Sequence, residues 1–159
     1  MIVSLWSQTN HLSHTKLVTG GDDFYNWFLG PRMIYTSGIV SDITRAETLE
    51  ELQDNKMKLV CEKLDLKEDD RLLDVGCGWG TLAAFAAKNY GCDVTGITLG
   101  KNQTKFGNDR IKENGVSHDK ARILCMDYRE IPGGPGHYTK IVSLEMAEVC
   151  SDSLGQLQC

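Results

Sequence analysis

The chain has 159 residues, of which 41% are hydrophobic and 25% are charged, a composition that is ordinary for one globular domain. Its 17 basic and 22 acidic residues leave a net charge of −5, which argues against a nucleic-acid-binding surface. No apolar run approaches the roughly 18–20 residues that span a bilayer, so we expect a cytoplasmic protein or one attached peripherally to a membrane. The six cysteines form no C-x-x-C motif, so we expect a reducing compartment. His11 and His14 have no carboxylate or cysteine near them in the sequence that could complete a metal site, so we expect no metal.

Within the first third of the chain, the sequence patterns that predict structure differ from one segment to the next. Residues 1–21 carry little pattern, whereas residues 22–31 are dense in aromatic side chains and end in Gly-Pro. For these aromatics we favour core packing, and contact with a ligand or a lipid is the alternative. The spacing Thr44-x-x-Glu47 is that of a capping box, and it predicts a helix that runs to about Leu64 with an apolar stripe and a charged, solvated face.

The most informative stretch is residues 71–80, Arg-Leu-Leu-Asp-Val-Gly-Cys-Gly-Trp-Gly. Its apolar run predicts a strand buried on both faces, and residues 81–88 predict a helix. The glycines fall at G-x-G-x-G rather than at the G-x-G-x-x-G of dinucleotide-binding folds, because Thr81 occupies the sixth position. A strand, a glycine turn and a helix bring the backbone close to a bound nucleoside.

Asp74 lies inside this strand, two residues before the first glycine. A buried carboxylate costs several kcal/mol unless it is paired or hydrogen-bonded, so we expect Asp74 to have a partner. Together, the strand, the carboxylate and the glycines point to a site for S-adenosylmethionine. The alternative is a structural strand-to-helix turn in which the glycines serve only tight packing.

Further strands are predicted at residues 92–97, 121–125 and 140–144, with a helix between residues 98 and 114. Strands that alternate with helices indicate a parallel sheet, whose ligands bind beyond the carboxyl ends of the strands. Polar clusters reach the carboxyl end of each predicted strand: Asp74 with the glycines, residues 98–103, Asp127 with Tyr128, and Glu145 with Glu148. A dinucleotide enzyme usually carries Asp or Glu in place of Thr98, which counts against NAD.

Three segments resemble the cyclopropane-fatty-acid synthase family of S-adenosylmethionine-dependent enzymes: Leu-Leu-Asp-Val-Gly-Cys-Gly-Trp-Gly, Gly-Ile-Thr-Leu-Gly-Lys-Asn-Gln and Ser-Leu-Glu-Met-Ala-Glu. Two more are similar to the fungal sphingolipid C9-methyltransferases: Phe-Leu-Gly-Pro-Arg-Met-Ile-Tyr-Thr-Ser-Gly-Ile-Val-Ser-Asp and Ala-Arg-Ile-Leu-Cys-Met-Asp-Tyr-Arg. The resemblance covers roughly residues 21–148. It implies an α/β, Rossmann-like fold of the class I S-adenosylmethionine-dependent methyltransferases. Here the fold is incomplete, with about four parallel strands in the order 3-2-1-4 after an N-terminal helical segment.

The resemblance also implies the residues of a site. Implied cofactor contacts are Tyr35, Thr36, Asp74, Gly76, Cys77, Gly78, Gly80, Thr98, Leu99, Gly100, Lys101, Asn102, Gln103, Tyr128 and Arg129. Glu148 stands at the position of a glutamate that helps to hold a proton-accepting bicarbonate, and Ser37 stands where many cyclopropane synthases have a cysteine ligand. The implied catalytic residues are therefore Glu148 and Ser37, with bicarbonate as a second small ligand.

The activity implied is an electrophilic methyl transfer to the alkene of a lipid chain, after which the carbocation loses a proton. For the sphingolipid enzymes the substrate is glucosylceramide, methylated at C9 of its long-chain base.

The resemblance stops after Glu148, where the family continues with His-Val-Gly. We therefore expect a truncated enzyme with a divergent start (1–21), a helical cap (22–66), a cofactor-binding core (67–148) and a divergent tail (149–159). We also expect no counterpart of the membrane-spanning segments of full-length fungal members in these residues. One alternative is a non-catalytic remnant that binds S-adenosylmethionine or pairs with another chain through the open edge of its fourth strand. The other is a small-molecule methyltransferase of a different family, which the Tyr-Thr-Ser segment at 35–37 disfavours.

Overall fold

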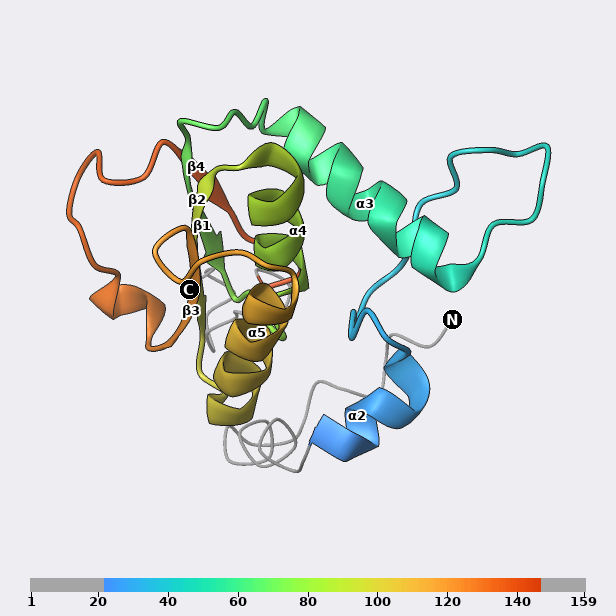
Figure 1. The fold of residues 1–159 in the computed structure, drawn as a ribbon, viewed down its shortest axis with the longest axis horizontal. Helices are drawn as coiled ribbons and strands as arrows, with labels where there is room; N and C mark the ends of the chain where they lie inside the picture. The colour runs from blue at the N-terminus through green and yellow to red at the C-terminus, as the bar shows by residue number, and fades with distance from the viewer. Residues whose placement is uncertain (1–21, 147–159) are drawn as a thin grey trace, which may run out of the picture.

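A computed structural model describes residues 22–146 of the chain (Figure 1). Its elements are, in chain order, α2 (Asp22–Leu29), α3 (Leu49–Lys63), β1 (Arg71–Val75), α4 (Thr81–Tyr90), β2 (Asp93–Thr98), α5 (Lys101–Glu113), β3 (Ala121–Cys125), the short 3-10 helix η1 (Tyr128–Glu130) and β4 (Lys140–Val142). From β1 onward, strands and helices alternate up to β3, as the sequence pattern predicts.

The strands form one parallel sheet in the order β3-β2-β1-β4. In the middle of β1, Leu73 pairs with Thr95 of β2 on one side and with Ile141 of β4 on the other. The predicted fold class and strand order are therefore confirmed. The bounds differ slightly, since β2 ends at Thr98 rather than at residue 97 and β4 ends at Val142 rather than at residue 144.

Helices α3, α4 and α5 lie on one side of the sheet (Figure 1), and one cluster of buried side chains joins them to the strands. The strands contribute Leu72, Val94, Ala121, Ile123 and Val142 to this cluster. The α4 helix contributes Leu82, Ala83, Ala84, Ala86 and Ala87, and such small side chains let a helix pack close to a sheet. The core therefore lies between the sheet and these helices, and it fixes the carboxyl ends of the strands relative to one another.

The aromatic run of α2 packs only in part. Leu29 and Met33 are buried against Trp79 of the glycine loop, and the Tyr25 ring centroid lies 4.7 Å from that of Trp79. By contrast, Trp27 is 80% exposed. Core packing, the role favoured from the sequence, is thus found for one part of the run and not for the other.

The turn after α2 is held to the core by hydrogen bonds from two helices. The guanidinium of Arg110 on α5 donates to the carbonyls of Pro31 and Arg32, over 2.8 and 2.7 Å. The hydroxyl of Thr81, at the start of α4, donates to the same Arg32 carbonyl over 2.7 Å. Arg32 also pairs with Asp54 of α3 at 2.6 Å. Hydrogen bonds to charged groups are among the stronger ones, so residues 31–32 form a fixed point beside the sheet.

The capping box of α3 is not the one predicted. The N-cap is Thr48, whose hydroxyl accepts from the Glu51 amide over 3.2 Å, and the Glu51 carboxylate accepts from the Thr48 amide over 2.8 Å. Thr44 instead donates both its amide and its hydroxyl to the Asp42 carboxylate, and Glu47 accepts from Ser41. Two consecutive T-x-x-E patterns, at 44–47 and 48–51, compete here, and the local hydrogen bonds of the first keep its threonine in a loop. The helix therefore begins at Leu49, later than expected.

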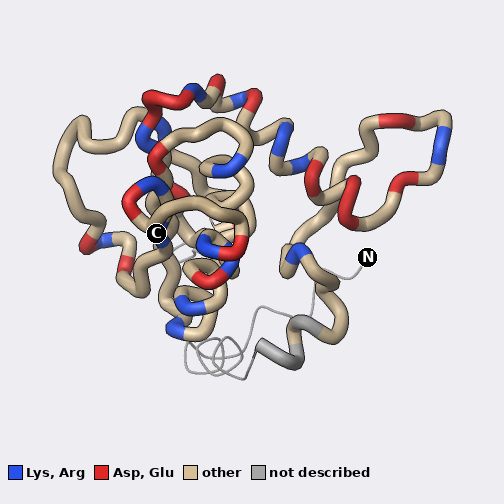
Figure 2. The backbone as a smooth tube through the Cα atoms, in the orientation of Figure 1, with Lys and Arg blue, Asp and Glu red and all other residues tan. Residues whose placement is uncertain are grey.

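Acidic and basic residues are interspersed along the described part of the chain (Figure 2). Several form local pairs, such as Lys105 with Asp109 at 2.7 Å on α5 and Arg122 with Asp93 at 2.7 Å between β3 and β2. No helix within residues 22–146 has the length and apolar character needed to cross a bilayer.

Candidate functional site

The loops that follow β1, β2 and β3 are tied together at the carboxyl edge of the sheet. The amides of Gly76 and Cys77 both donate to the carbonyl of Ile97, each over 3.0 Å. The amide of Met126 donates to the carbonyl of Thr98, also over 3.0 Å. Backbone hydrogen bonds therefore bring three loops that are distant in sequence onto one edge, where ligands of parallel sheets bind.

The three glycines of the β1 loop have positive φ angles of 77°, 55° and 71° at Gly76, Gly78 and Gly80, a conformation that favours glycine. Their surroundings differ. A Cβ on Gly78 would meet no atom of residues 22–146 within 4 Å. A Cβ on Gly80 would lie 2.9 Å from the Ile123 side chain, and one on Gly76 would lie 3.2 Å from the sulfur of Met146. Of the three implied cofactor contacts, Gly78 alone opens onto free space among the described residues. Gly80 instead permits close packing of the core.

The Cys77 side chain points into the protein. Its sulfur lies 2.9 Å from the place where a Cβ on Gly96 would stand, so the absence of a side chain at Gly96 makes room for the thiol. Burial, with a smaller contribution from Asp74, raises the pKa of this thiol well above its usual value. The thiol therefore stays protonated and serves packing, and only the backbone of Cys77 faces the loop.

Asp74 is buried within the sheet, with 3% of its surface exposed. Its carboxyl accepts no hydrogen bond from residues 22–146, and burial alone raises its pKa to about 7. The expected partner of this carboxyl is thus not found in the part of the chain that the structure describes. A buried carboxyl of raised pKa beside an open loop is a typical feature of a binding site.

The segment after β2 is organised by one buried side-chain hydrogen bond. The hydroxyl of Thr98 donates to the amide oxygen of Gln103 over 2.6 Å, and the Gly100 amide donates to the Thr98 hydroxyl over 3.4 Å. Gly100 is the N-cap of α5 and supplies no side-chain cap, so the first amides of the helix remain open to a polar ligand group. The other residues expected in this segment lie at the surface: Leu99, Lys101 and Asn102.

The loop after β3 is held by an ion pair. The Asp127 carboxylate accepts from the backbone amide of Arg129 over 2.9 Å and from two nitrogens of its guanidinium, over 2.9 and 2.6 Å. These hydrogen bonds lower the pKa of Asp127 to about 2. The Arg129 guanidinium is therefore directed at Asp127, and Tyr128 begins η1 between them.

A three-residue cluster links the N-terminal segment to the end of β4. The Thr36 hydroxyl donates to the Glu145 carboxylate, the Lys56 ammonium on α3 donates to the Thr36 hydroxyl, and the Lys56 ammonium lies 2.7 Å from the Glu145 carboxylate. Next to Thr36, Tyr35 is 66% exposed and its ring contacts Tyr25 edge-on. The structure thus places the Tyr35–Thr36 pair beside the β4 end of the sheet's carboxyl edge.

Glu145 was expected among the polar residues at this edge but not as a cofactor contact, and Lys56 was not expected there. Glu145 has a φ of 57°, a left-handed conformation that is uncommon for a residue with a side chain. Burial raises its pKa, but hydrogen bonds from Lys56 and Thr36 outweigh this, so the pKa lies below its usual value. The sequence predicted that the charged residues of this helix form a solvated face. The Lys56 side chain is instead largely buried, with 16% of its surface exposed.

Some predicted residues cannot be placed. Glu148, His11 and His14 lie outside residues 22–146, as do the segments 1–21 and 149–159. Ser37, the other residue expected to be catalytic, lies in an exposed position after Thr36.

Solved structures show the same fold. The cyclopropane synthase MmaA2 from Mycobacterium tuberculosis superposes with a TM-score of 0.73 at 30% identity, covering 86% of this chain and 46% of that one. The mycolic acid cyclopropane synthase CmaA1, solved with S-adenosylhomocysteine and CTAB, gives a TM-score of 0.70 at 29% identity over 86% of this chain and 46% of that one. The four-stranded sheet and its glycine loop therefore define a class I S-adenosylmethionine-dependent methyltransferase fold.

Residues 9–154 match the model of the mycolic acid cyclopropane synthetase family, and the chain belongs to this family. Among individual relatives, sphingolipid C9-methyltransferase 2 of Gibberella zeae is 63% identical over 128 residues, which are 80% of this chain and 25% of that protein. Sphingolipid C9-methyltransferase 1 of the same fungus is 62% identical over 148 residues, 93% of this chain and 28% of that protein. The resemblance stated from the motifs is confirmed. The chain spans about a quarter of the length of these relatives.

Proposed function

We propose that the chain forms the cofactor-binding part of an S-adenosylmethionine-dependent methyltransferase that acts on an unsaturated lipid chain. The finer proposal is methylation at C9 of the long-chain base of glucosylceramide. The fungal relatives of 62–63% identity, named as sphingolipid C9-methyltransferases, support this substrate. The single observation in the structure that carries the cofactor proposal is the open space beside Gly78 at the carboxyl edge of the sheet.

The residues at this edge fit the chemistry of S-adenosylmethionine. The Asp74 carboxyl lacks a partner within residues 22–146, and the cofactor carries an ammonium and a sulfonium that would offset its charge. The Thr98–Gln103 pair presents a hydroxyl and an amide, which are suited to ribose hydroxyls. Tyr128 and Arg129 are proposed to contact the adenine, for which an aromatic ring and a planar guanidinium are suited.

When bound, the cofactor supplies an electrophilic methyl group. The residues of the chain then bind the cofactor and orient it toward the substrate. In our proposal the backbone of the Gly76–Gly80 loop approaches the methionine part, while Tyr35 and Thr36 close over it and exclude water. Lys56 and Glu145 hold Thr36 in place through hydrogen bonds to its hydroxyl.

The proton that leaves after methyl transfer needs an acceptor. We assign this role to a bicarbonate held with the help of Glu148, and we place Ser37 near it, as the family resemblance implies. Because the substrate is a lipid, we also propose peripheral contact with a membrane surface.

Calorimetry of the 159-residue chain with S-adenosylmethionine tests the cofactor site. Gly78→Val fills the open space and is expected to abolish binding. Gly115→Val is the matched control, because Gly115 has a φ of 74° and equally open surroundings but lies after α5. The proposal is wrong if the unaltered chain does not bind, and the loop is misplaced if both variants bind equally.

A methyl-transfer assay on Δ8-unsaturated glucosylceramide tests the lipid proposal. Transfer to C9 supports the finer proposal, and transfer to another unsaturated lipid supports only the coarser one. Binding of S-adenosylmethionine without any transfer favours the alternative of a chain that binds the cofactor without catalysis.

A further inference from the structure

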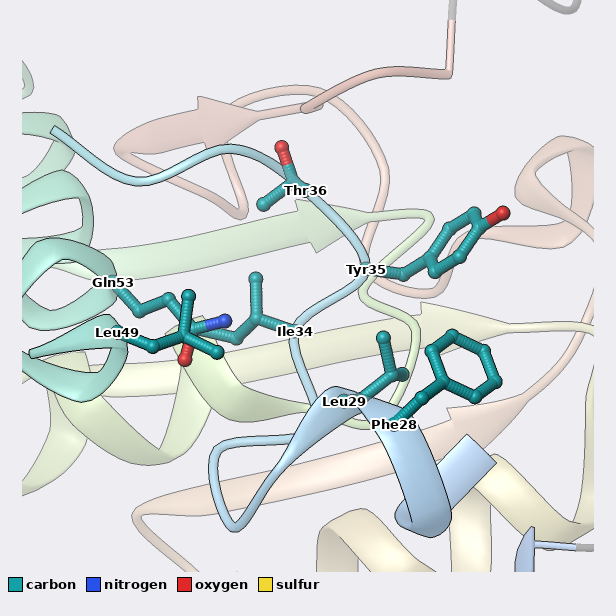
Figure 3. A pocket seen from close by; sticks show the side chains of 7 residues that line it. All are labelled: Phe28, Leu29, Ile34, Tyr35, Thr36, Leu49 and Gln53. Carbon is teal, nitrogen blue, oxygen red and sulfur yellow. The ribbon is translucent and has the colours of Figure 1, made fainter. Parts of the chain in front are cut away.

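A cavity of about 390 Å³ lies between α2, α3 and the segment that carries Tyr35 and Thr36 (Figure 3). It is lined by Phe28, Leu29, Ile34, Tyr35, Thr36, Leu49 and Gln53. Among the described residues that line it, none has a charged side chain and most are apolar. The cavity therefore suits a neutral and largely hydrophobic ligand.

Gln53 is the exception in this lining. Its side chain extends from α3 toward Ile34 (Figure 3), and it is 2% exposed. The oxygen of its side-chain amide is buried and has no hydrogen-bond partner within residues 22–146. Thr36, the other aliphatic polar residue in the lining, is already engaged by Lys56 and Glu145. Buried amides are ordinarily hydrogen-bonded, so the Gln53 amide is available to a ligand in the cavity.

A primary amide both donates and accepts hydrogen bonds. Its natural complement in an apolar cavity is a group that does the same, such as a hydroxyl or a secondary amide on an alkyl chain. A simple fatty acyl chain has no such group along its length, whereas an N-acylated amino alcohol carries both next to its hydrocarbon.

From this we infer that the cavity binds the amide- and hydroxyl-bearing part of an N-acylated long-chain amino alcohol, with Gln53 as its hydrogen-bond partner. The inference rests on the proposed function, and it places the lipid next to the cofactor, because Tyr35 and Thr36 line the cavity and are also proposed to cover S-adenosylmethionine. Gln53 is thus a specificity residue that separates such lipids from plain hydrocarbon chains.

Binding of a short-chain ceramide to the 159-residue chain, measured by calorimetry without S-adenosylmethionine, tests this inference. Gln53→Leu replaces the side chain by a slightly shorter apolar one and removes its polar atoms. It is expected to weaken ceramide binding by about three- to tenfold, the value of one lost hydrogen bond, while binding of a long-chain alkene is unchanged. Equal ceramide affinity in both proteins, or no ceramide binding by the unaltered chain, overturns the inference.

A second variant tests the place of binding. Leu49→Trp fills the cavity from its rim, where Leu49 is 48% exposed, and is expected to weaken binding of ceramide and alkene alike. Ile43→Trp adds the same ring at a position that is 94% exposed and outside the lining, and is expected to bind both as before. If the two variants bind ceramide equally well, the site lies elsewhere.

The outcomes are separable from those of the proposed function. S-adenosylmethionine binding is measured on the same proteins, and Gln53→Leu is expected to leave it unchanged. Loss of cofactor binding in the unaltered chain with ceramide binding intact rejects the proposed function and keeps the lipid site. Cofactor binding without ceramide binding keeps the proposed cofactor site and rejects the lipid site.

Discussion

The buried carboxyl of Asp74 makes a quantitative prediction about stability. The pKa of this group is raised from 3.8 to about 7 in the folded chain because burial disfavours its charged form. Below pH 3.8 the group is protonated in both the folded and the unfolded chain and costs nothing. As the pH rises toward 7 the unfolded chain ionises while the folded chain stays neutral, so the contribution of this group to stability falls, and the loss is complete above pH 7.

The size of this loss follows from the shift. A change of about 3 pKa units at about 1.36 kcal/mol per unit corresponds to roughly 4 kcal/mol. Asp74→Asn has nearly the same shape and no charge. It is therefore expected to raise the free energy of unfolding by about 2–4 kcal/mol at pH 8, since the asparagine amide still lacks a partner and gives back a part of the gain. Near pH 4 the gain from removing the charge is almost absent, so the variant is expected to be as stable as the unaltered chain or slightly less stable.

Urea unfolding at pH 4, 5 and 8 measures this directly. Asp109→Asn, a change at an exposed carboxylate of α5, is the matched control and is expected to alter stability by under about 1 kcal/mol at each pH. A gain for Asp74→Asn that is the same at every pH, or a loss at pH 8, would refute the reasoning. Calorimetry of the same variant is expected to show weaker S-adenosylmethionine binding, because the negative charge that the cofactor would neutralise is gone.

Three further changes test other parts of the structure. Gly80→Ala is expected to lower the free energy of unfolding by about 1–3 kcal/mol, since its methyl would overlap the core and its φ of 71° strains any side chain; thermal unfolding measures this. Lys56→Met is expected to weaken S-adenosylmethionine binding severalfold in calorimetry, whereas Lys58→Met, on the exposed face of the same helix, leaves it unchanged. Thr48→Ala is expected to cost about 1 kcal/mol in urea unfolding and Thr44→Ala less, because Thr48 caps α3.

Each of these has an outcome that contradicts it. Unchanged stability in Gly80→Ala would mean that the neighbouring core side chains move enough to accommodate the added methyl group. Equal cofactor affinities for the Lys56 and Lys58 variants would mean that the cluster of Lys56, Thr36 and Glu145 does not position the cofactor. A larger loss for Thr44→Ala than for Thr48→Ala would mean that the predicted capping box forms after all.

Much of the fold was predictable because its signals are local. The Leu-Leu-Asp-Val run with its glycines defines β1 and the loop after it, and the alternation of strands and helices defines a parallel sheet. The start of α3 was predicted wrongly, because Thr44-x-x-Glu47 and Thr48-x-x-Glu51 are equivalent patterns in sequence. The Asp42 carboxylate, which holds Thr44 in a loop, decides between them.

The site was predictable only where one motif carries it. Gly78 follows from its motif, but the packing role of Gly80 depends on Ile123 and Gly107, which no local pattern connects to it. Lys56 and Glu145 are 89 positions apart, so their ion pair needed the folded chain.

Gln53 could have been found from the sequence. It stands four residues before Met57 on the buried face of α3, with Cys61 a further turn along the same face. A polar residue in an apolar stripe signals a hydrogen bond that must be made with some partner.

The hydrogen bonds from Arg110 to the carbonyls of Pro31 and Arg32 limit how a ligand could enter beneath residues 34–38. Hydrogen bonds to a guanidinium contribute about 1.5–3 kcal/mol each, so lifting residues 31–32 is costly. Any gate over the sheet must therefore pivot downstream of this anchor, near Met33, whose φ of 51° already marks a bend. Entry or release of a ligand would then move Tyr35 and Thr36 outward together. The same motion would break the hydrogen bonds of Thr36 to Lys56 and Glu145.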